Sequence, residues 1–210
     1  AGGTPNVAIT VNNGDEAPTA PTVTPGVGWD FTGWDPVLPA TITADITTTA
    51  QYVPITYTLT FQVSEHGSLD GVTTQTVEHG MDGTAVAAMP DAGYEFDRWD
   101  DGSTENPRRF TNVLTDITVT ATFTINEYTV TFQPGPHGTL AGGTPNVSAN
   151  VPHGDAAPAY PAVTADVGWE FVGWDPILPA TITADVTVTA LFEAVVPTDP
   201  AGEFELVFDS

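Results

Sequence analysis

The segment Gly28-Trp-Asp-Phe-Thr-Gly-Trp-Asp-Pro36 recurs, with two changes, as Gly168-Trp-Glu-Phe-Val-Gly-Trp-Asp-Pro176. The flanking sequence recurs too, since residues 1–7 are identical to residues 141–147 and residues 38–45 are identical to residues 178–185. A shift of about 140 residues is twice a unit of about 70, and a fixed period of this kind is the signature of a tandem-repeat protein. We therefore expect a middle repeat between the two matching copies.

The middle repeat is present in a diverged form. It opens with Tyr57-Thr-Leu-Thr-Phe61, carries Gly93-Tyr-Glu-Phe-Asp-Arg-Trp-Asp100 in place of the double-tryptophan segment, and closes with Thr115-Asp-Ile-Thr-Val-Thr-Ala-Thr-Phe123. We predict a first repeat at residues 1–53, a second at 54–124, a third at 125–193, a proline-rich linker at 194–202 and a C-terminal strand at 203–210.

Apolar and polar residues alternate in every repeat, which is the period of a β-strand and not that of a helix. The alternation is clearest in the opening stretches 57–63 and 128–132 and in the closing stretches 117–123 and 186–192. Threonine and other β-branched residues separate the apolar positions, as suits a sheet with one solvated face. The sequence therefore predicts an all-β protein built from small domains.

Glycine marks the predicted reversals of the chain. His-Gly or Asn-Gly pairs, in which glycine supplies a positive φ, occur at 13–14, 66–67, 79–80, 137–138 and 153–154. All four histidines belong to these pairs, so we interpret them as turn residues and not as metal ligands or proton carriers. Gly33 and Gly173 lie inside strand patterns instead, and predict β-bulges that turn the following tryptophan inward.

Acidic residues dominate the charge, because 27 Asp and Glu face only 3 Lys and Arg, for a formal net charge of −24. This charge repels phosphate backbones and anionic lipids, so we expect neither nucleic acid nor a membrane surface as a partner. Cations and basic surfaces suit it better, and solubility is its simplest interpretation. No run approaches the roughly 20 apolar residues of a transmembrane helix, so we predict no transmembrane segment.

Patterns typical of catalysis are missing from the sequence. It contains no cysteine and no lysine, no Gly-x-Ser-x-Gly elbow, no phosphate-binding glycine loop and no His-Glu-x-x-His pair. We therefore predict no enzymatic activity, no catalytic residues and no cofactor.

A cluster of acidic residues suggests a calcium site as an alternative to a protein that binds no metal. The candidate ligands are Asp97, Asp100, Asp101 and Glu105. Calcium prefers such oxygens, but the cluster lacks the spacing of an EF-hand loop. Three further aspartates each precede a closing strand, and we interpret them as a repeated turn cap: Asp45, Asp116 and Asp185.

Each repeat contains a trio of large aromatic residues: Trp29, Phe31 and Trp34; Tyr94, Phe96 and Trp99; Trp169, Phe171 and Trp174. An exposed trio would suit sugar stacking. A domain of about 70 residues has few other residues with which to fill its interior, however, and each large aromatic buries about 150–250 Å². We therefore predict that the trios form the cores.

These motifs resemble the Listeria–Bacteroides repeat, the B-repeat of internalin B, in its divergent form. The resemblance rests on the opening Tyr128 to Phe132, the middle Gly93 to Trp99 and the closing Asp116 to Phe123. It implies compact β-grasp-like units joined head to tail as a linear rod, in secreted or cell-surface proteins, with neighbouring domains as partners. It implies no catalysis, and an extracellular location.

The predicted strands are not distributed equally among the repeats. The first repeat lacks the opening strand that the other two have, whereas residues 203–208 mirror residues 127–132 position by position. A domain without one strand exposes unpaired backbone and an apolar groove. We therefore hypothesise that residues 203–208 of one copy complete the first repeat of the next, in a head-to-tail filament. The interface candidates are Phe204, Leu206, Val207 and Phe208.

Two alternatives remain open from the sequence. In the first, the chain is an excerpt of a longer array whose missing strand lies upstream of residue 1. In the second, the repeats form an adhesin module that binds a glycan or a host protein, and exposure of an aromatic trio would indicate it.

Overall fold

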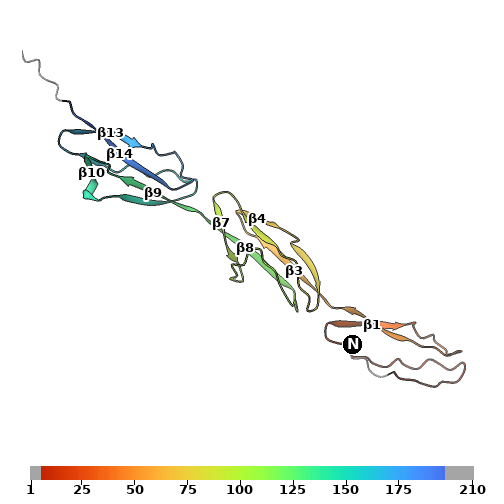
Figure 1. Ribbon diagram of the computed structural model, residues 1–210. Helices are drawn as coiled ribbons and strands as arrows, with labels where there is room; N and C mark the ends of the chain where they lie inside the picture. The colour runs from red at the N-terminus through yellow and green to blue at the C-terminus, as the bar shows by residue number, and fades with distance from the viewer. Residues whose placement is uncertain (1–5, 197–210) are drawn as a thin grey trace, which may run out of the picture. The chain divides into compact units, whose positions relative to one another are not determined.

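The computed structural model describes residues 6–196 of the chain. Over this part the chain forms fourteen β-strands and one 3-10 turn, Ala141–Gly143, so the predicted all-β fold is confirmed. Two compact units are present (Figure 1): the residues up to Asp91 with Phe96–Phe123, and Ala92–Glu95 with the residues from Thr124 onwards. No helix within residues 6–196 is long and apolar enough to cross a membrane.

The second unit is built on a four-stranded sheet with the strand order β11-β9-β14-β13. The strands are β9 (Glu127–Gln133), β11 (Val147–Pro152), β13 (Trp169–Asp175) and β14 (Val186–Ala194). β9 pairs antiparallel with β11 and parallel with β14, so the opening strand lies beside the closing strand. A separate antiparallel pair consists of β10 (Gly138–Leu140) and β12 (Val163–Ala165).

The core of this sheet lies along β9, because alternate residues of that strand point to the same face. Val130 and Phe132 are 0 and 2 % exposed. They pack in one cluster with Leu140, Val151, Ile182 and Val188. Thr131, between them in sequence, is on the outer face, where its hydroxyl oxygen lies 3.2 Å from that of Ser148 on β11.

The first unit contains the same arrangement, with the strand order β5-β3-β8-β7. The strands are β3 (Thr56–Val63), β5 (Thr74–Glu78), β7 (Tyr94–Trp99) and β8 (Ile117–Ile125). β3 pairs antiparallel with β5 and parallel with β8. Short strands β4 (Gly67–Asp70) and β6 (Ala87–Pro90) pair separately. Leu59 and Phe61 of β3 and Trp99 of β7 lie in the core.

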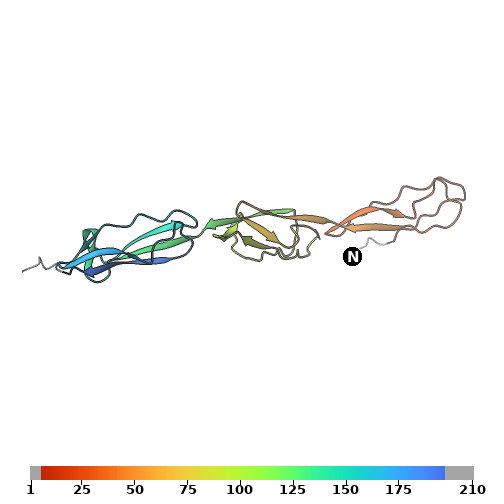
Figure 2. The ribbon, with the colours of Figure 1, turned by 90° about the horizontal axis from the view of Figure 1, so that it is seen from above.

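The first unit also carries a hairpin of β1 (Trp29–Asp35) and β2 (Thr49–Pro54). Its register shifts between Phe31 and Gly33, as the register of β13 and β14 does at Gly173, so both predicted bulges are confirmed. Figure 2 shows the hairpin, in orange, continuing into loops without strands. The predicted linker and C-terminal strand at 194–210 lie outside the described residues from 197 onwards.

Candidate functional site

A groove with a volume of about 1200 Å³ opens beside β2. Its lining consists of residues 6–13, 18–23 and 42–50 with Trp34, Leu38 and Tyr52. The repeat alignment makes residues 7–12 the counterpart of β11, and β2 the counterpart of the second half of β14. In the second unit β9 lies between those two elements, whereas no strand lies there within residues 6–53. The groove therefore takes the place of a central strand.

Apolar side chains at the groove are open to solvent. Val7, Ile9 and Ile46 are 65, 54 and 40 % exposed. Their counterparts in the third repeat are partly buried: Val147, Ala149 and Val186. Deeper in the groove, three partly exposed residues, Ile42, Thr48 and Ala50, correspond to residues of the third repeat that are 0 % exposed, Ile182, Val188 and Ala190. Similar residues are thus buried where a central strand is present and exposed where it is not.

The backbone at the groove is unpaired as well. Residues 46–48 correspond to the β14 residues that pair with β9, and they form no strand and have no strand partner among residues 6–196. Residues 7–12 form no strand, although their counterpart in the third repeat is β11. Backbone without a strand partner is a template for an added strand, because its N–H and C=O groups can pair with those of the incoming chain.

In the complete repeats an aspartate binds the backbone of the opening strand. Asp116 and Asp185 each accept a hydrogen bond at 2.8 Å from the backbone N–H of the opening strand, at Thr58 and Thr129 respectively. The interpretation of these residues as local turn caps was wrong, since their partners are 58 and 56 residues away in sequence. Asp45 occupies the same sequence position and lines the groove.

Two histidines of the predicted turns also hold the opening strands. His79 Nδ1 lies 3.2 Å from the Tyr57 hydroxyl, and its backbone N–H donates to the carbonyl of Ile55 at 2.8 Å. His153 repeats the ring contact and the backbone hydrogen bond, with its ring 5.9 Å from that of Tyr128 and its N–H donating to Asn126. Its buried Nδ1 has no hydrogen-bond partner among the described residues.

Each of these rings also packs against a glycine of a preceding turn. His79 lies against Gly28, and His153 lies against Gly93, both glycines having a positive φ. The interpretation of the histidines as turn residues did not include these contacts. The alignment of the repeats does distinguish the position, because the first repeat has Asn13 where the third has His153.

The aromatic trios are not equally buried. Trp99 is 0 % exposed and donates its indole N–H to the carbonyl of Glu105 at 2.9 Å. Trp169 stacks on His137 with 3.5 Å between the ring centroids. The prediction that all nine residues are core needs correction at three of them, since Trp29, Phe31 and Phe171 are 48, 36 and 40 % exposed.

In the first repeat the exposure has a structural reason. In the complete repeats a glycine covers the aromatic residue of the closing strand: Gly67 contacts Phe123, and Gly138 contacts Phe192. The first repeat has no such segment within residues 6–53, and Tyr52, which corresponds to Phe192, is 37 % exposed.

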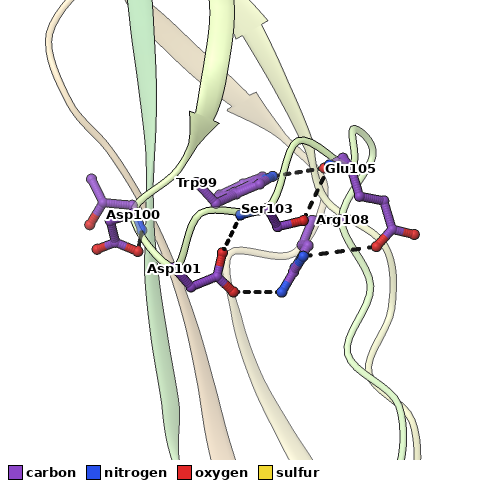
Figure 3. A network of polar contacts seen from close by, with 7 residues as sticks. Trp99, Asp100, Asp101, Ser103, Glu105 and Arg108 are labelled. Atoms are coloured by element: carbon purple, nitrogen blue, oxygen red, sulfur yellow. Dashed lines mark hydrogen bonds and ion pairs between the residues drawn. The ribbon is translucent and has the colours of Figure 1, made fainter.

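The candidate calcium ligands have other partners (Figure 3). Asp101 binds Arg108 at 2.6 Å, and Glu105 lies 3.9 Å from the same guanidinium group. Asp100 accepts the backbone N–H of Thr120 at 3.1 Å. No group of three His, Asp or Glu side chains suited to a metal is found within residues 6–196. The calcium hypothesis therefore gains no support from the geometry.

The fourth candidate ligand, Asp97, pairs with Arg98 at 3.0 Å. The hydrogen bond and the negative charge of Asp97 raise the pKa of the Arg98 guanidinium. The three arginines of the chain, Arg98, Arg108 and Arg109, thus each pair with a nearby aspartate of the second repeat. None of these cations lines the groove.

Comparison with known protein families gives a match over two consecutive ranges. The family model for the divergent InlB B-repeat domain matches residues 57–127 and residues 128–196. Both ranges begin at the tyrosine of an opening strand, Tyr57 or Tyr128. A search of curated proteins finds no match.

Proposed function

The chain belongs to the divergent InlB B-repeat domain family, and we propose that it is a non-enzymatic structural segment of an extracellular or cell-surface protein. Three features support this: the family, the tandem all-β architecture, and a net charge of −24 that suits a solvated surface. Neighbouring domains of the same surface protein would then be its covalent partners.

Our proposal includes three repeats, at 1–53, 54–124 and 125–193. The family model covers the second and the third. The first is proposed as a further copy because residues 28–36 and 38–45 match the third almost without change, and because β1 and β2 share the bulge of β13 and β14.

We further propose that the groove of the first repeat receives residues 203–208 of another copy as its missing central strand. The observation that carries this is the exposure of Ile9, Ile42 and Ile46, at positions that are more buried in the complete third repeat. Burying them would remove apolar area from water at about 25 cal/mol per Å². The incoming strand would also pair with residues 46–48, the counterparts of the β14 residues that pair with β9.

An assembly formed by this contact can grow at both ends. Strand and groove are different surfaces of one chain, so each copy would offer its strand to one neighbour and its groove to another. A contact of this kind does not close on itself unless the rotation between copies happens to form a ring. We propose a head-to-tail filament.

The test is the size of the purified chain, measured by light scattering over a range of concentrations. We expect polymers for the unaltered chain and monomers for a variant lacking residues 203–210. Leu206→Asp should also give monomers, because it would place a charge in the core of the completed repeat. Glu205→Gln is the matched control, since its side chain would face solvent, and it should still assemble.

Monomers for the unaltered chain at every concentration would contradict assembly through residues 203–208. Polymers that persist without residues 203–210 would contradict the proposal as well, because assembly would then use another surface.

A second candidate function is supported by the exposed aromatic rings of the hairpin. Phe31 lies 5.8 Å from Tyr52 and 5.9 Å from Trp34, and Trp29 is about half exposed. Aromatic faces of this kind stack on sugar rings. Titration with soluble oligosaccharides, followed by tryptophan fluorescence, tests it: binding should be lost in Trp29→Ala and retained in the variant lacking residues 203–210.

A further inference from the structure

We infer that the groove accepts the incoming strand in a single register, with Leu206 between Ile9 and Ile46 and with Val207 opposite Ala8. This inference rests on the proposed strand exchange and adds the residue pairs that would form it. The pairs are derived from the complete repeats, from the sequence of residues 203–208, and from the turn that meets the first aromatic residue of the strand.

The complete repeats supply the template. In the third repeat Val130 pairs with Ala149 on one side and with Val186 on the other. The second repeat has the same arrangement, in which Leu59 pairs with Gln75 and with Ile117. A shift of 140 residues converts Ala149 into Ile9 and Val186 into Ile46. A strand in the groove would therefore run antiparallel to residues 7–12 and parallel to residues 46–48, which lead into β2.

The strand sequence selects the register. Phe204, Leu206 and Phe208 align with Tyr128, Val130 and Phe132, which all point to the same face. A slip by one residue would turn Glu203 and Glu205 toward the core, and burying an unpaired carboxylate is strongly unfavourable. A slip by two residues would keep the face, but it would place Ser210 at the position of Phe132 in one direction and Gly202 at the position of Tyr128 in the other.

The turn that contains Asn13 differs from the corresponding turns of the other two repeats, and the proposed strand differs from their opening strands at the residue that would meet it. In the complete repeats an opening tyrosine meets a histidine, as Tyr57 meets His79 and Tyr128 meets His153. The proposed strand begins with phenylalanine, Phe204, and the corresponding residue of the first repeat is Asn13. The Tyr57 hydroxyl lies 3.2 Å from Nδ1 of His79, a contact that Phe204 could not make because it has no hydroxyl.

Asp45 would fix the same end of the strand. Its counterparts Asp116 and Asp185 accept the backbone N–H one residue after the tyrosine, at Thr58 and Thr129. In the proposed register that N–H belongs to Glu205. Three independent positions, Asn13, Ile9 and Asp45, therefore agree on one alignment of residues 203–208.

Engineered cysteines test the register directly, because the chain contains none of its own. Val207 and Ala8 correspond to Thr131 and Ser148, whose hydroxyl oxygens lie 3.2 Å apart on the outer face. Directly opposed antiparallel residues have Cα atoms about 4.5–5.5 Å apart, within the range of a disulfide. Substitutions on this face leave the core unchanged.

The donor is Val207→Cys in the full chain. The acceptor is Ala8→Cys in a chain that lacks residues 203–210 and so has only an open groove. Thr10→Cys in the same shortened chain is the matched control, because it lies on the same face two residues along. After mild oxidation of each mixture, mass spectrometry separates the mixed disulfide from the two homodimers, since donor and acceptor differ in mass.

We expect at least about tenfold more mixed disulfide with Ala8→Cys than with Thr10→Cys, because a two-residue slip loses core burial. More product with Thr10→Cys would overturn the register while strand exchange stands. Assembly without mixed disulfide in either mixture would also overturn it, since the strand would lie elsewhere. Failure of the proposed function is seen separately, as monomers of the unaltered chain in light scattering.

Discussion

Two tryptophans show how differently one kind of side chain is used in this molecule. Trp99 is fully buried, packs edge to face against Phe61 at 5.7 Å and donates a hydrogen bond, whereas Trp29 is about half exposed. Trp99→Ala should reduce the free energy of unfolding by about 3–5 kcal/mol. Trp29→Ala should reduce it by less than about 1 kcal/mol. Hydrogen exchange of the amides of β3 and β8 measures the first effect and that of β1 and β2 the second, and an equal loss of protection in the two variants would contradict the assignment.

The aspartates before the closing strands give a second residue-scale prediction. Asp185→Ala removes the acceptor of the Thr129 N–H and should destabilise the third repeat by about 1 kcal/mol, a reduced value because the site is exposed. Asp45→Ala should leave the stability of the monomer unchanged and should weaken assembly. Urea unfolding, carried out without residues 203–210, checks the first effect, and light scattering of the full chain checks the second. Destabilisation of the monomer by Asp45→Ala would argue against its role toward an incoming strand.

At the scale of elements, the turns before β7 and β13 form a natural pair for comparison. Gly93 and Gly168 have φ values of 86° and 84°, but only Gly93 is covered by a histidine ring, since nothing lies within 4 Å of a Cβ placed at Gly168. Gly168→Ala should cost about 1–2 kcal/mol from backbone strain alone. Gly93→Ala should cost more, and His153→Ala in the same chain should recover part of the difference. Equal losses in urea unfolding would show that the histidine contact contributes nothing.

The sequence predicts the strands of these repeats well, because their signal is local. Alternation marks β3, β8, β9 and β14, and glycine inside the alternation marks the bulges at Gly33 and Gly173. The alignment of residues 1–53 with the third repeat also predicts an open groove beside residues 7–12.

The remaining features depend on contacts between distant residues. The parallel pairing of β3 with β8 joins residues about 58 positions apart, and no local pattern specifies it. The partner of Asp116 follows from that pairing, so the residue looked like a local cap in the sequence. The burial of a tryptophan depends on what covers it, which is why Trp29 and Trp99 could not be distinguished by type.

At the scale of the whole molecule, charge should control the rate of assembly. The proposed strand contributes Glu203, Glu205 and Asp209, the first repeat contributes further acids, and all three arginines lie in the second repeat. Like charges therefore meet at the interface without a cation between them. Raising NaCl from roughly 20 to roughly 200 mM should speed polymer growth by screening this repulsion. Slower growth in salt, followed by light scattering over time, would indicate an attractive electrostatic contact instead.

The parallel pairing of opening and closing strands has a mechanical consequence. A force that pulls on the two ends of the second or third repeat acts along β3 and β8, or along β9 and β14, in opposite directions. The hydrogen bonds of the ladder then bear the load together in shear, and do not open one after another as in a peeled hairpin. A strand received by the groove would lie parallel to residues 46–48, which lead into β2, in the same way. The link between two copies would thus resist tension through the same type of ladder as each continuous repeat, although no covalent bond crosses it.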